Sequence, residues 1–410
     1  MPAALGLVYA MVPLFPSFIA LTGVAFPGIS LVPRTAVFAI FGLCGLLAIY
    51  ATTMLIRYPL RGSQPLLLPL AAIVGAGILA GALGFDPRAG VVFTFIGALG
   101  VIWHCSLVRF YGDRNAALVL LSAYLLSGGV AAALAIGMVV LHAPAAQYAI
   151  AHGRATGTFI LPGELAGYLI VLLPIAYAVA CIAERRWLRI VSWSVFAIGL
   201  AALALTYSRA GWMGFAAAAA FLAAARTRYR ATVAVAIVAA GILAVLLLFN
   251  AHHDPSEDYT RLSIWQAAIQ IIDRFPLTGV GPFNFAKLYA IVRAPDADPV
   301  AFHAHSLYLT FFAEFGIVGV TAVAWLTWRF VVELRRRLLE ADPRERFLAL
   351  SVTAGLVGIA VQGLIDTVSV VIFGLWMPTL GLALAAARGS HTDGAGAASP
   401  ARPFAESTRK

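Results

Sequence analysis

Long apolar runs recur along the whole chain and constrain its fold more than any other feature. A helix needs about 20 consecutive apolar residues to cross the hydrocarbon layer of a membrane. We expect about twelve such spans, at 4–25, 35–56, 65–85, 90–109, 115–141, 162–183, 188–208, 210–226, 230–250, 306–332, 345–365 and 368–387. The sequence therefore predicts an all-α polytopic membrane protein with a single transmembrane domain, residues 1–387.

The charge content excludes a water-soluble globule. Only 11% of the 410 residues are charged and 62% are hydrophobic, whereas soluble domains carry roughly a quarter charged residues. The formal net charge of +10 does not indicate a nucleic-acid partner, because no stretch is long enough to form a soluble domain that would display a basic face. We expect the lipid bilayer to cover most of the surface.

Basic residues mark every second connector between the predicted spans. They are Arg57 and Arg61, Arg109 and Arg114, Arg185, Arg186 and Arg189, Arg226, Arg228 and Arg230, and Arg335, Arg336, Arg337, Arg344 and Arg346. By the positive-inside rule these connectors and both termini are cytoplasmic. The tail 388–410, rich in Gly, Ala, Ser and Pro, is predicted to be a disordered cytoplasmic segment.

One connector, residues 251–304, is far longer than the others and is predicted to lie on the outer face. Loops longer than about 12–15 residues are usually functional or disordered. Residues 264–275 have apolar side chains at helical spacing, which predicts a short amphipathic helix at the membrane interface. Gly279 and Gly281 follow it, either as a simple turn or as a place where a ligand approaches the backbone closely. Any chemistry is expected in this loop.

Several positive charges are predicted on the outer face, where the topology rule disfavours them. They are Arg154, Arg209, Arg261, Arg274, Lys287 and Arg293. Arg209 lies in a very tight turn between two apolar runs, at or near membrane depth, where an arginine costs about 2.5–3.5 kcal/mol on insertion scales. It is either a snorkelling arginine at a helix end or part of an anion site, because a guanidinium binds phosphate oxygens bidentately.

His305 is the candidate general base. It opens the predicted span at 306–332, where the helix dipole disfavours protonation and leaves a neutral imidazole. The alternative is a polar cap at the membrane interface. His303 and Tyr308 lie beside it in the sequence.

The sequence has no characteristic metal-ligand spacing. Three groups contain residue types that can bind metals: His303 and His305 with His252 and His253, the pair Asp296 and Asp298, and the cysteines Cys44, Cys105 and Cys181. The histidine spacing is generic, the aspartates are also typical of a solvated loop, and the cysteines fall in or at the ends of apolar runs. We expect no metal and no cofactor.

Three carboxylates fall in or near predicted spans: Glu164, Glu314 and Asp366. Such groups indicate a proton or ion path, or counter-ions for the outer arginines. Proton-coupled transporters usually show repeated halves with broken helices, and no such symmetry is visible. Pairing with the arginines is the simpler interpretation for Glu164 and Glu314.

Four stretches together resemble the O-antigen ligase family of bacterial envelope enzymes, which includes related protein O-oligosaccharyltransferases. They are Arg154-Ala-Thr-Gly157-Thr158-Phe159 with Pro162 and Tyr168, Ser208-Arg209-Ala-Gly211, Arg261 to Trp265 running on to Pro276 and Gly279-Val-Gly281, and His305-Ser-Leu-Tyr308 with Glu314 and Gly319. The resemblance covers about 154–319. The chain departs from the pattern at Ser306 and Gly163, where an asparagine is usual.

The resemblance implies a GT-C-like glycosyltransferase of the bacterial inner membrane with its site on the periplasmic face. It implies transfer of a glycan from undecaprenyl pyrophosphate to lipid A–core oligosaccharide, inverting and without a metal. In that mechanism His305 would be the base, and Arg209 and Arg261 would bind the pyrophosphate. Further substrate contacts would come from Arg154, Arg293, His303, Tyr308, Gly279 and Gly281.

Two rival functions fit the same residues. An O-antigen polymerase or a protein-glycosylating ligase would share the donor site and differ in the acceptor, and the short tail after Ala387 favours the ligase. A transporter of lipid-linked sugars would place its basic residues along a path through the membrane, whereas here they gather at the outer face and the predicted cytoplasmic connectors.

Overall fold

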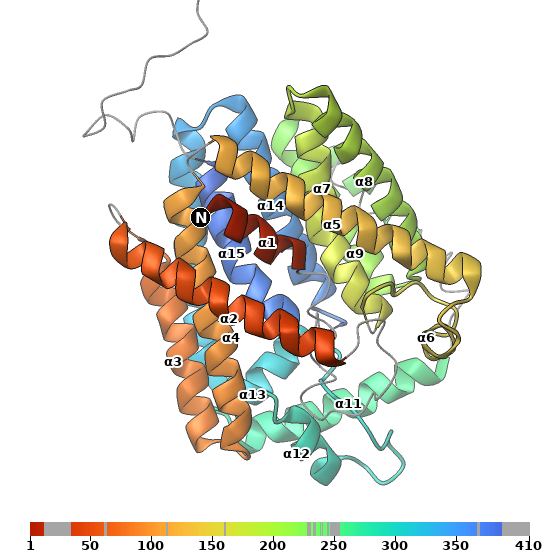
Figure 1. Ribbon diagram of the computed structural model, residues 1–410. Helices are drawn as coiled ribbons and strands as arrows, with labels where there is room; N and C mark the ends of the chain where they lie inside the picture. Colours follow the sequence, from red (N-terminus) through yellow and green to blue (C-terminus); the bar gives the residue numbers. More distant parts are fainter. Residues whose placement is uncertain are drawn as a thin grey trace, which may run out of the picture.

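The computed structural model describes residues 1–11, 34–60, 64–111, 114–159, 161–227, 255–366 and 370–387, with scattered helical positions between 231 and 246. All regular elements in this part of the chain are α-helices, as predicted (Figure 1). They are α1 (Pro2–Met11), α2 (Arg34–Arg57), α3 (Leu67–Leu83), α4 (Pro87–Phe110), α5 (Arg114–Leu141), α6 (Ala145–Ile150), α7 (Pro162–Ile182), α8 (Arg186–Leu205), α9 (Arg209–Arg226), α11 (Pro255–Arg274), α12 (Phe285–Val292), α13 (Leu307–Glu340), α14 (Pro343–Gln362) and α15 (Val370–Ala386).

Six helices in the described ranges are long and apolar enough to cross a membrane. They are α4, residues Ala117–Leu141 of α5, α7, α8, α13 and α14. Shorter apolar stretches are Gly42–Arg57, Leu67–Leu83 and Met377–Ala386. The all-α membrane class is confirmed, and the number of spans stays a prediction. Most of the predicted spans 4–25 and 230–250, and the tail 388–410, lie outside the described residues.

Helix α7 forms the centre of the bundle. Within its membrane-length window 83% of the residues are buried, and it packs against α8, α9 and α14. Glycines allow this close packing: a Cβ added to Gly214 of α9 would lie 2.7 Å from the carbonyl oxygen of Gly358 in α14. Small residues let helix backbones approach closely where lipid supplies no hydrophobic driving force. Helices α7, α9 and α14 are thereby held as one unit.

The predicted cytoplasmic connectors contact one another at one end of the bundle. Arg344 Nη1 lies 2.6 Å from Glu184 Oε1, which joins the first turn of α14 to the connector after α7. The guanidinium of Arg226 lies over the Phe347 ring at 4.1 Å. The alternation of charge seen in the sequence therefore corresponds to two ends of the bundle, and which end faces the cytoplasm stays a prediction.

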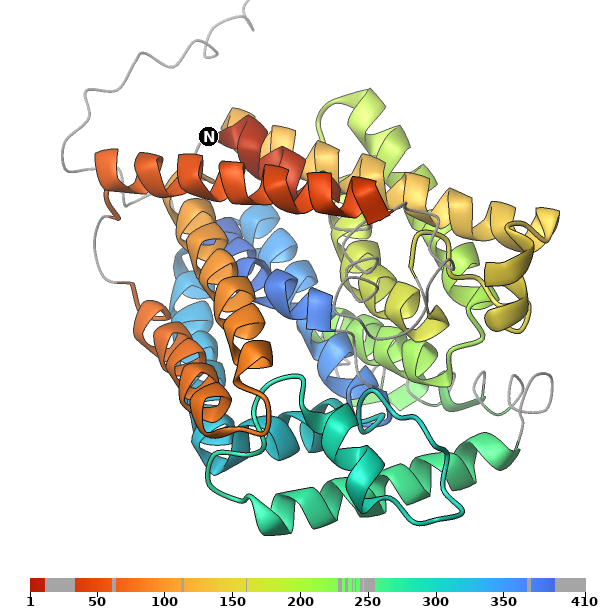
Figure 2. The same cartoon turned by 60° about the horizontal axis from the view of Figure 1, so that its bottom comes forward.

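The long connector forms α11 and α12, which lie together across the other end of the bundle (Figures 1 and 2). The amphipathic helix expected at 264–275 begins earlier, at Pro255, because proline is favoured in the first helical turn. The span expected at 306–332 is α13, which continues to Glu340 and is interrupted at Gly316 (φ 59°, ψ −164°). The interruption lies where residues 276–281 pack against α13.

Candidate active site

His305 lies in the loop just before α13 and has an unusual backbone conformation. Its φ is +46°, in the left-handed region, which costs a non-glycine residue about 1–3 kcal/mol. Its backbone N–H donates to Nδ1 of His303 at 3.2 Å, and the two rings meet edge to face at 4.5 Å. Strained residues persist only where their surroundings fix them, and they are common at active sites.

The start of α13 is fixed on the end of α14. The backbone N–H of Leu307 donates to the carbonyl oxygens of Gly363 at 2.8 Å and Asp366 at 3.1 Å. The hydroxyl of Tyr308 donates to the carbonyl oxygen of Ala360 at 2.8 Å. The predicted substrate contact Tyr308 therefore also anchors this segment, although its side chain remains half exposed.

A carboxylate approaches the His305 ring. Asp366, in the turn after α14, places Oδ1 4.0 Å from Nδ1 of His305. The sequence offered Asp366 only as a carboxylate at the end of a span. Asp366 and His305 are 61 positions apart in the sequence. They meet because the start of α13 is hydrogen-bonded to the turn after α14.

The imidazole of His305 is neutral at pH 7. Burial, and after it the nearby Arg261 charge, lower its pKa to about 4 against the opposing effect of Asp298. Burial, His305 and Arg261 also lower the pKa of His303 well below its usual value. The sequence predicted a neutral imidazole from the helix dipole. In the structure, burial and the charge of Arg261 are the causes of the lowered pKa. The ring is therefore available to accept a proton.

Arg261 comes from α11 and faces the two histidines. It lies one turn from Ile264 and two from Ala268, both almost fully buried, so it sits at the edge of the inward face of α11. Trp265 follows one turn later, and its indole nitrogen is buried without a hydrogen-bond acceptor. Arg261, His303 and His305 are therefore close enough to act on one another electrostatically, and their roles in a single site stay a prediction.

Arg209 is the first residue of α9, after the N-cap Ser208, whose Oγ accepts the Gly211 N–H at 3.1 Å. A cation at a helix N-terminus opposes the helix dipole, whereas an anion there is stabilised by both the arginine and the free N–H groups. A Cβ added to Gly211 would lie 2.6 Å from Cβ of Ala166 in α7. The N-termini of α9 and α7 therefore meet, and α7 in turn contacts the turn that holds Asp366.

Arg154 lies in the loop beside the Arg209 turn. The N–H of Ala155 donates to the carbonyl oxygen of Leu205 at 2.8 Å, just before that turn. Nε of Arg154 donates to the carbonyl oxygen of Ala151 at 3.3 Å. This arginine is thus close in space to the Arg209 turn, with part of its hydrogen-bonding capacity used within its own loop.

Two other cations predicted on the outer face have partners within the long connector or at the start of α4. Arg293, at the end of α12, donates to the carbonyl oxygen of Ala297 at 3.0 Å. Lys287 pairs with Asp86, the N-cap of α4, and its hydrogen bond is the main cause of a lowered pKa at that carboxyl. Both contacts stabilise the long connector, and a substrate role for Arg293 stays a prediction.

Gly279 and Gly281 approach the backbone of the protein itself. A Cβ on Gly279 would lie 2.3 Å from the carbonyl carbon of Glu314, and one on Gly281 2.9 Å from the Ala80 carbonyl oxygen. The Gly281 N–H donates to the Glu314 carbonyl oxygen at 3.0 Å. The Glu314 carboxylate accepts the Phe285 N–H at 3.3 Å, so in the described residues it caps α12 rather than pairing with an arginine. Packing of the long connector accounts for both glycines.

Metal binding finds no support in the ranges that the structure describes. No group of three or more His, Cys, Asp or Glu side chains there is arranged to hold a metal ion. His252 and His253 lie outside those ranges. Asp298 Oδ1 accepts the Val300 N–H at 3.0 Å within its own loop.

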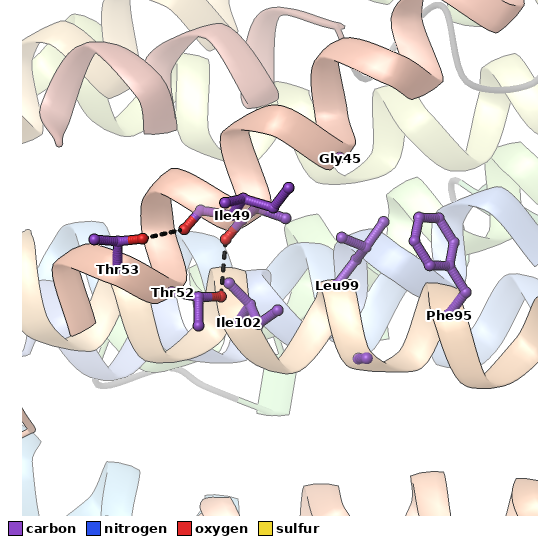
Figure 3. A pocket seen from close by; sticks show the side chains of 9 residues that line it. Gly45, Ile49, Thr52, Thr53, Phe95, Leu99 and Ile102 are labelled. Atoms are coloured by element: carbon purple, nitrogen blue, oxygen red, sulfur yellow. Dashed lines mark hydrogen bonds between the residues drawn. The ribbon is translucent and has the colours of Figure 1, made fainter. Parts of the chain in front are cut away.

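An apolar crevice of about 430 Å³ lies between α2 and α4, away from these residues (Figure 3). It is lined by Gly45, Ala48, Ile49, Thr52, Thr53, Phe95, Ala98, Leu99 and Ile102. The two threonine hydroxyls donate to carbonyl oxygens of their own helix, at 2.8 and 2.9 Å. The crevice therefore offers little to a polar ligand.

Sequence reasoning missed two features of this site. The pairing of Asp366 with His305 carries no local signal, because the two residues lie on different connectors. The unpaired indole nitrogen of Trp265 was also missed, although its spacing of four residues from Arg261 predicts a shared helix face.

Residues 194–324 match the family model described as O-antigen ligase. This region runs from α8 into α13 and contains Arg209, Arg261, His303 and His305. No curated protein matches the chain. The matched segment thus contains Arg209, Arg261, His303 and His305, and the match supports a relationship of this part of the chain to the O-antigen ligase family.

Proposed function

We propose that this protein transfers a glycan from undecaprenyl pyrophosphate to lipid A–core oligosaccharide on the periplasmic face of the bacterial inner membrane. The observation that carries the proposal is a neutral His305 held beside Arg261 within the segment that matches the O-antigen ligase model. A base next to a cation is what attack on a glycosyl pyrophosphate needs, because a proton leaves the acceptor while charge grows on the leaving group.

The reaction follows from these roles. His305 takes the proton of an acceptor sugar hydroxyl, whose oxygen attacks the anomeric carbon of the donor from the side opposite the pyrophosphate. The bond from the anomeric carbon to the pyrophosphate oxygen breaks, with inversion, and undecaprenyl pyrophosphate leaves. Arg209 and Arg261 bind the phosphate oxygens and stabilise the charge, which requires no metal in this mechanism. Arg154, beside the Arg209 turn, is a further candidate contact.

The first test is complementation of a Gram-negative strain that lacks its O-antigen ligase and has a compatible lipid A–core. Wild type is expected to restore the lipopolysaccharide ladder on a gel. Arg209→Ala, Arg261→Ala and His305→Ala are expected to lose it at equal membrane levels. Arg274→Ala, an exposed arginine at the end of the same helix as Arg261, and His142→Ala, an exposed histidine, are matched controls that should retain it.

The outcome also separates the rival functions. A polymerase would change the chain length of undecaprenyl-linked glycan and leave lipid A–core unmodified. A protein-glycosylating ligase would move the glycan to a protein band. If donor accumulates at normal chain length with an intact acceptor, and no protein is modified, the transfer proposal is wrong and the transporter interpretation gains.

A further inference from the structure

The last residue of α14 and the turn after it, residues 362–366, contact the starts of two other helices. Nε2 of Gln362 donates to the carbonyl oxygen of Gly163 at the start of α7, at 2.9 Å. The carbonyl oxygens of Gly363 and Asp366 accept the N–H of Leu307 at the start of α13. The N–H of Asp366 donates to the Gln362 carbonyl oxygen at 3.1 Å. The backbone of Asp366 is therefore fixed relative to both helices.

The Asp366 carboxylate lies between these two helix starts. One oxygen, Oδ1, is 4.0 Å from Nδ1 of His305. The other, Oδ2, lies over Gly163, where an added Cβ would come within 2.3 Å of it. Any side chain at position 163 would therefore displace the carboxylate from its place beside the imidazole.

We propose that Asp366 is the positioning residue of His305 and that Gly163 is kept small to admit it. The inference rests on the proposed role of His305 as the base. A neutral imidazole carries one N–H, and a carboxylate facing Nδ1 favours the tautomer with the proton on Nδ1. The lone pair of Nε2 is then directed away from Asp366, where it accepts the acceptor proton. The resemblance to the family pattern breaks at Gly163, and this contact gives a physical reason for the glycine.

The alternative is that the Asp366 side chain has a purely structural role. An Asp366→Asn variant distinguishes this alternative from the positioning role. The helix-to-helix bonds of this turn use the backbone of Asp366, so an Asp366→Asn variant retains them and keeps the side-chain shape. The other charged or titratable groups that act on His305 are Arg261 of α11, Asp298 of the long connector and the adjacent His303. None of them is altered by this substitution.

The experiment measures kcat and KM against pH for purified full-length protein in nanodiscs, with a polyprenyl-pyrophosphate-linked glycan and lipid A–core acceptor. Asp366→Asn is expected to lower kcat about tenfold to a hundredfold with the donor KM little changed. It should also move the acid limb of the profile to lower pH, because removal of a carboxylate disfavours the imidazolium. Gly163→Ala should cause a smaller loss of the same kind. Gly137→Ala, where an added Cβ meets nothing within 4 Å, is the matched control.

The double variant Gly163→Ala/Asp366→Asn should be no slower than Asp366→Asn alone, because both changes remove the same contact. Wild-type kcat and an unmoved acid limb in Asp366→Asn would overturn the positioning role. A loss in Gly163→Ala that persists undiminished in the Asp366→Asn background would overturn the role of Gly163.

A second measurement does not depend on transfer. The ¹⁵N shifts of His305 in histidine-labelled protein, assigned by comparison with His305→Gln, report which ring nitrogen carries the proton. Protonated Nδ1 in wild type, with a changed tautomer population in Asp366→Asn, supports the inference even if no transfer is found and the proposed function fails. An identical tautomer population in the two proteins would overturn it even if transfer is active.

Discussion

Residues 276–281 and 303–308 lie at the same end of the bundle, and both contain residues that the sequence marked as functional. In the first segment, residues 276–281, the backbone forms hydrogen bonds with α13 that stabilise the fold. The Val280 N–H donates to the Ala313 carbonyl oxygen at 2.9 Å, and the Ile317 N–H to the Pro276 carbonyl oxygen at 2.9 Å. These bonds occupy backbone groups that the break of α13 at Gly316 would leave unpaired.

In the second segment, residues 303–308, hydrogen bonds fix the backbone, but they do not involve the ring nitrogens of His305. Leu307 and Tyr308 make the contacts that hold the segment on α14. The neutral imidazole of His305 forms no hydrogen bond of its ring among those found in the described part of the chain, and it faces Asp366 at 4.0 Å. Polar groups that the fold uses are explained by packing, whereas a strained, neutral imidazole that the fold does not use requires a chemical explanation.

The strongest test of the first segment is Gly316→Ala. The backbone of Gly316, at φ 59° and ψ −164°, lies in a region nearly exclusive to glycine, and an added Cβ would lie 2.3 Å from the Leu277 carbonyl oxygen. We expect a loss of about 3 kcal/mol or more in the free energy of unfolding, or no folded protein. Denaturant unfolding in detergent measures it, with Gly137→Ala as control. Equal stability of the two variants would contradict the packing explanation.

The matching test of the second segment is Arg261→Lys, which keeps the charge and removes the planar, bidentate guanidinium. We expect kcat/KM for the lipid-linked donor to fall about tenfold to a hundredfold without loss of folded protein. Arg274→Lys on the same helix should change neither quantity. If Arg261→Lys instead lowers stability and leaves kcat/KM unchanged, Arg261 belongs with the structural group.

The pH dependence should follow His305. Because its pKa is lowered to about 4, mainly by burial and then by Arg261, the base form is present at neutral pH and is lost only as the pH falls through about 4. Stability has the same sign: unfolded histidine binds a proton near pH 6.5, so stability is full above that value and falls as the pH drops towards 4.

Arg261→Met should move the acid limb of the transfer rate to higher pH, because it removes a charge that disfavours the imidazolium. Rates measured in nanodiscs from pH 4 to 8 provide the check, with Arg274→Met as control. A limb that stays in place in Arg261→Met would show that burial alone accounts for the neutral ring.

The predictability of the fold and the site differs for physical reasons. Apolar runs of membrane length and clustered arginines gave the helical membrane class and the two ends of the bundle, since hydrophobicity and charge act locally. The break at Gly316 was missed because it depends on residues 276–281, about 40 positions earlier. Arg261 and His305 could be proposed from the sequence because each is chemically distinctive, and their roles stay predictions. The contact of Asp366 with Gly163 and His305 could not be predicted, because it forms only when three segments that are distant in the sequence meet.

The smallest expected effect concerns Ser306, which stands within the second segment but behaves like a residue of the first. As the N-cap of α13, its Oγ accepts a hydrogen bond from the Leu309 N–H at 3.5 Å. The same hydroxyl donates to the Gly363 carbonyl oxygen, also at 3.5 Å. Bonds of that length are weak, so Ser306→Ala should lower the free energy of unfolding by about 0.5–1 kcal/mol and leave kcat unchanged. A tenfold loss of kcat at unchanged stability would place the Ser306 hydroxyl among the reacting groups. The residue next to His305 would then have a role in the reaction and not only in the fold.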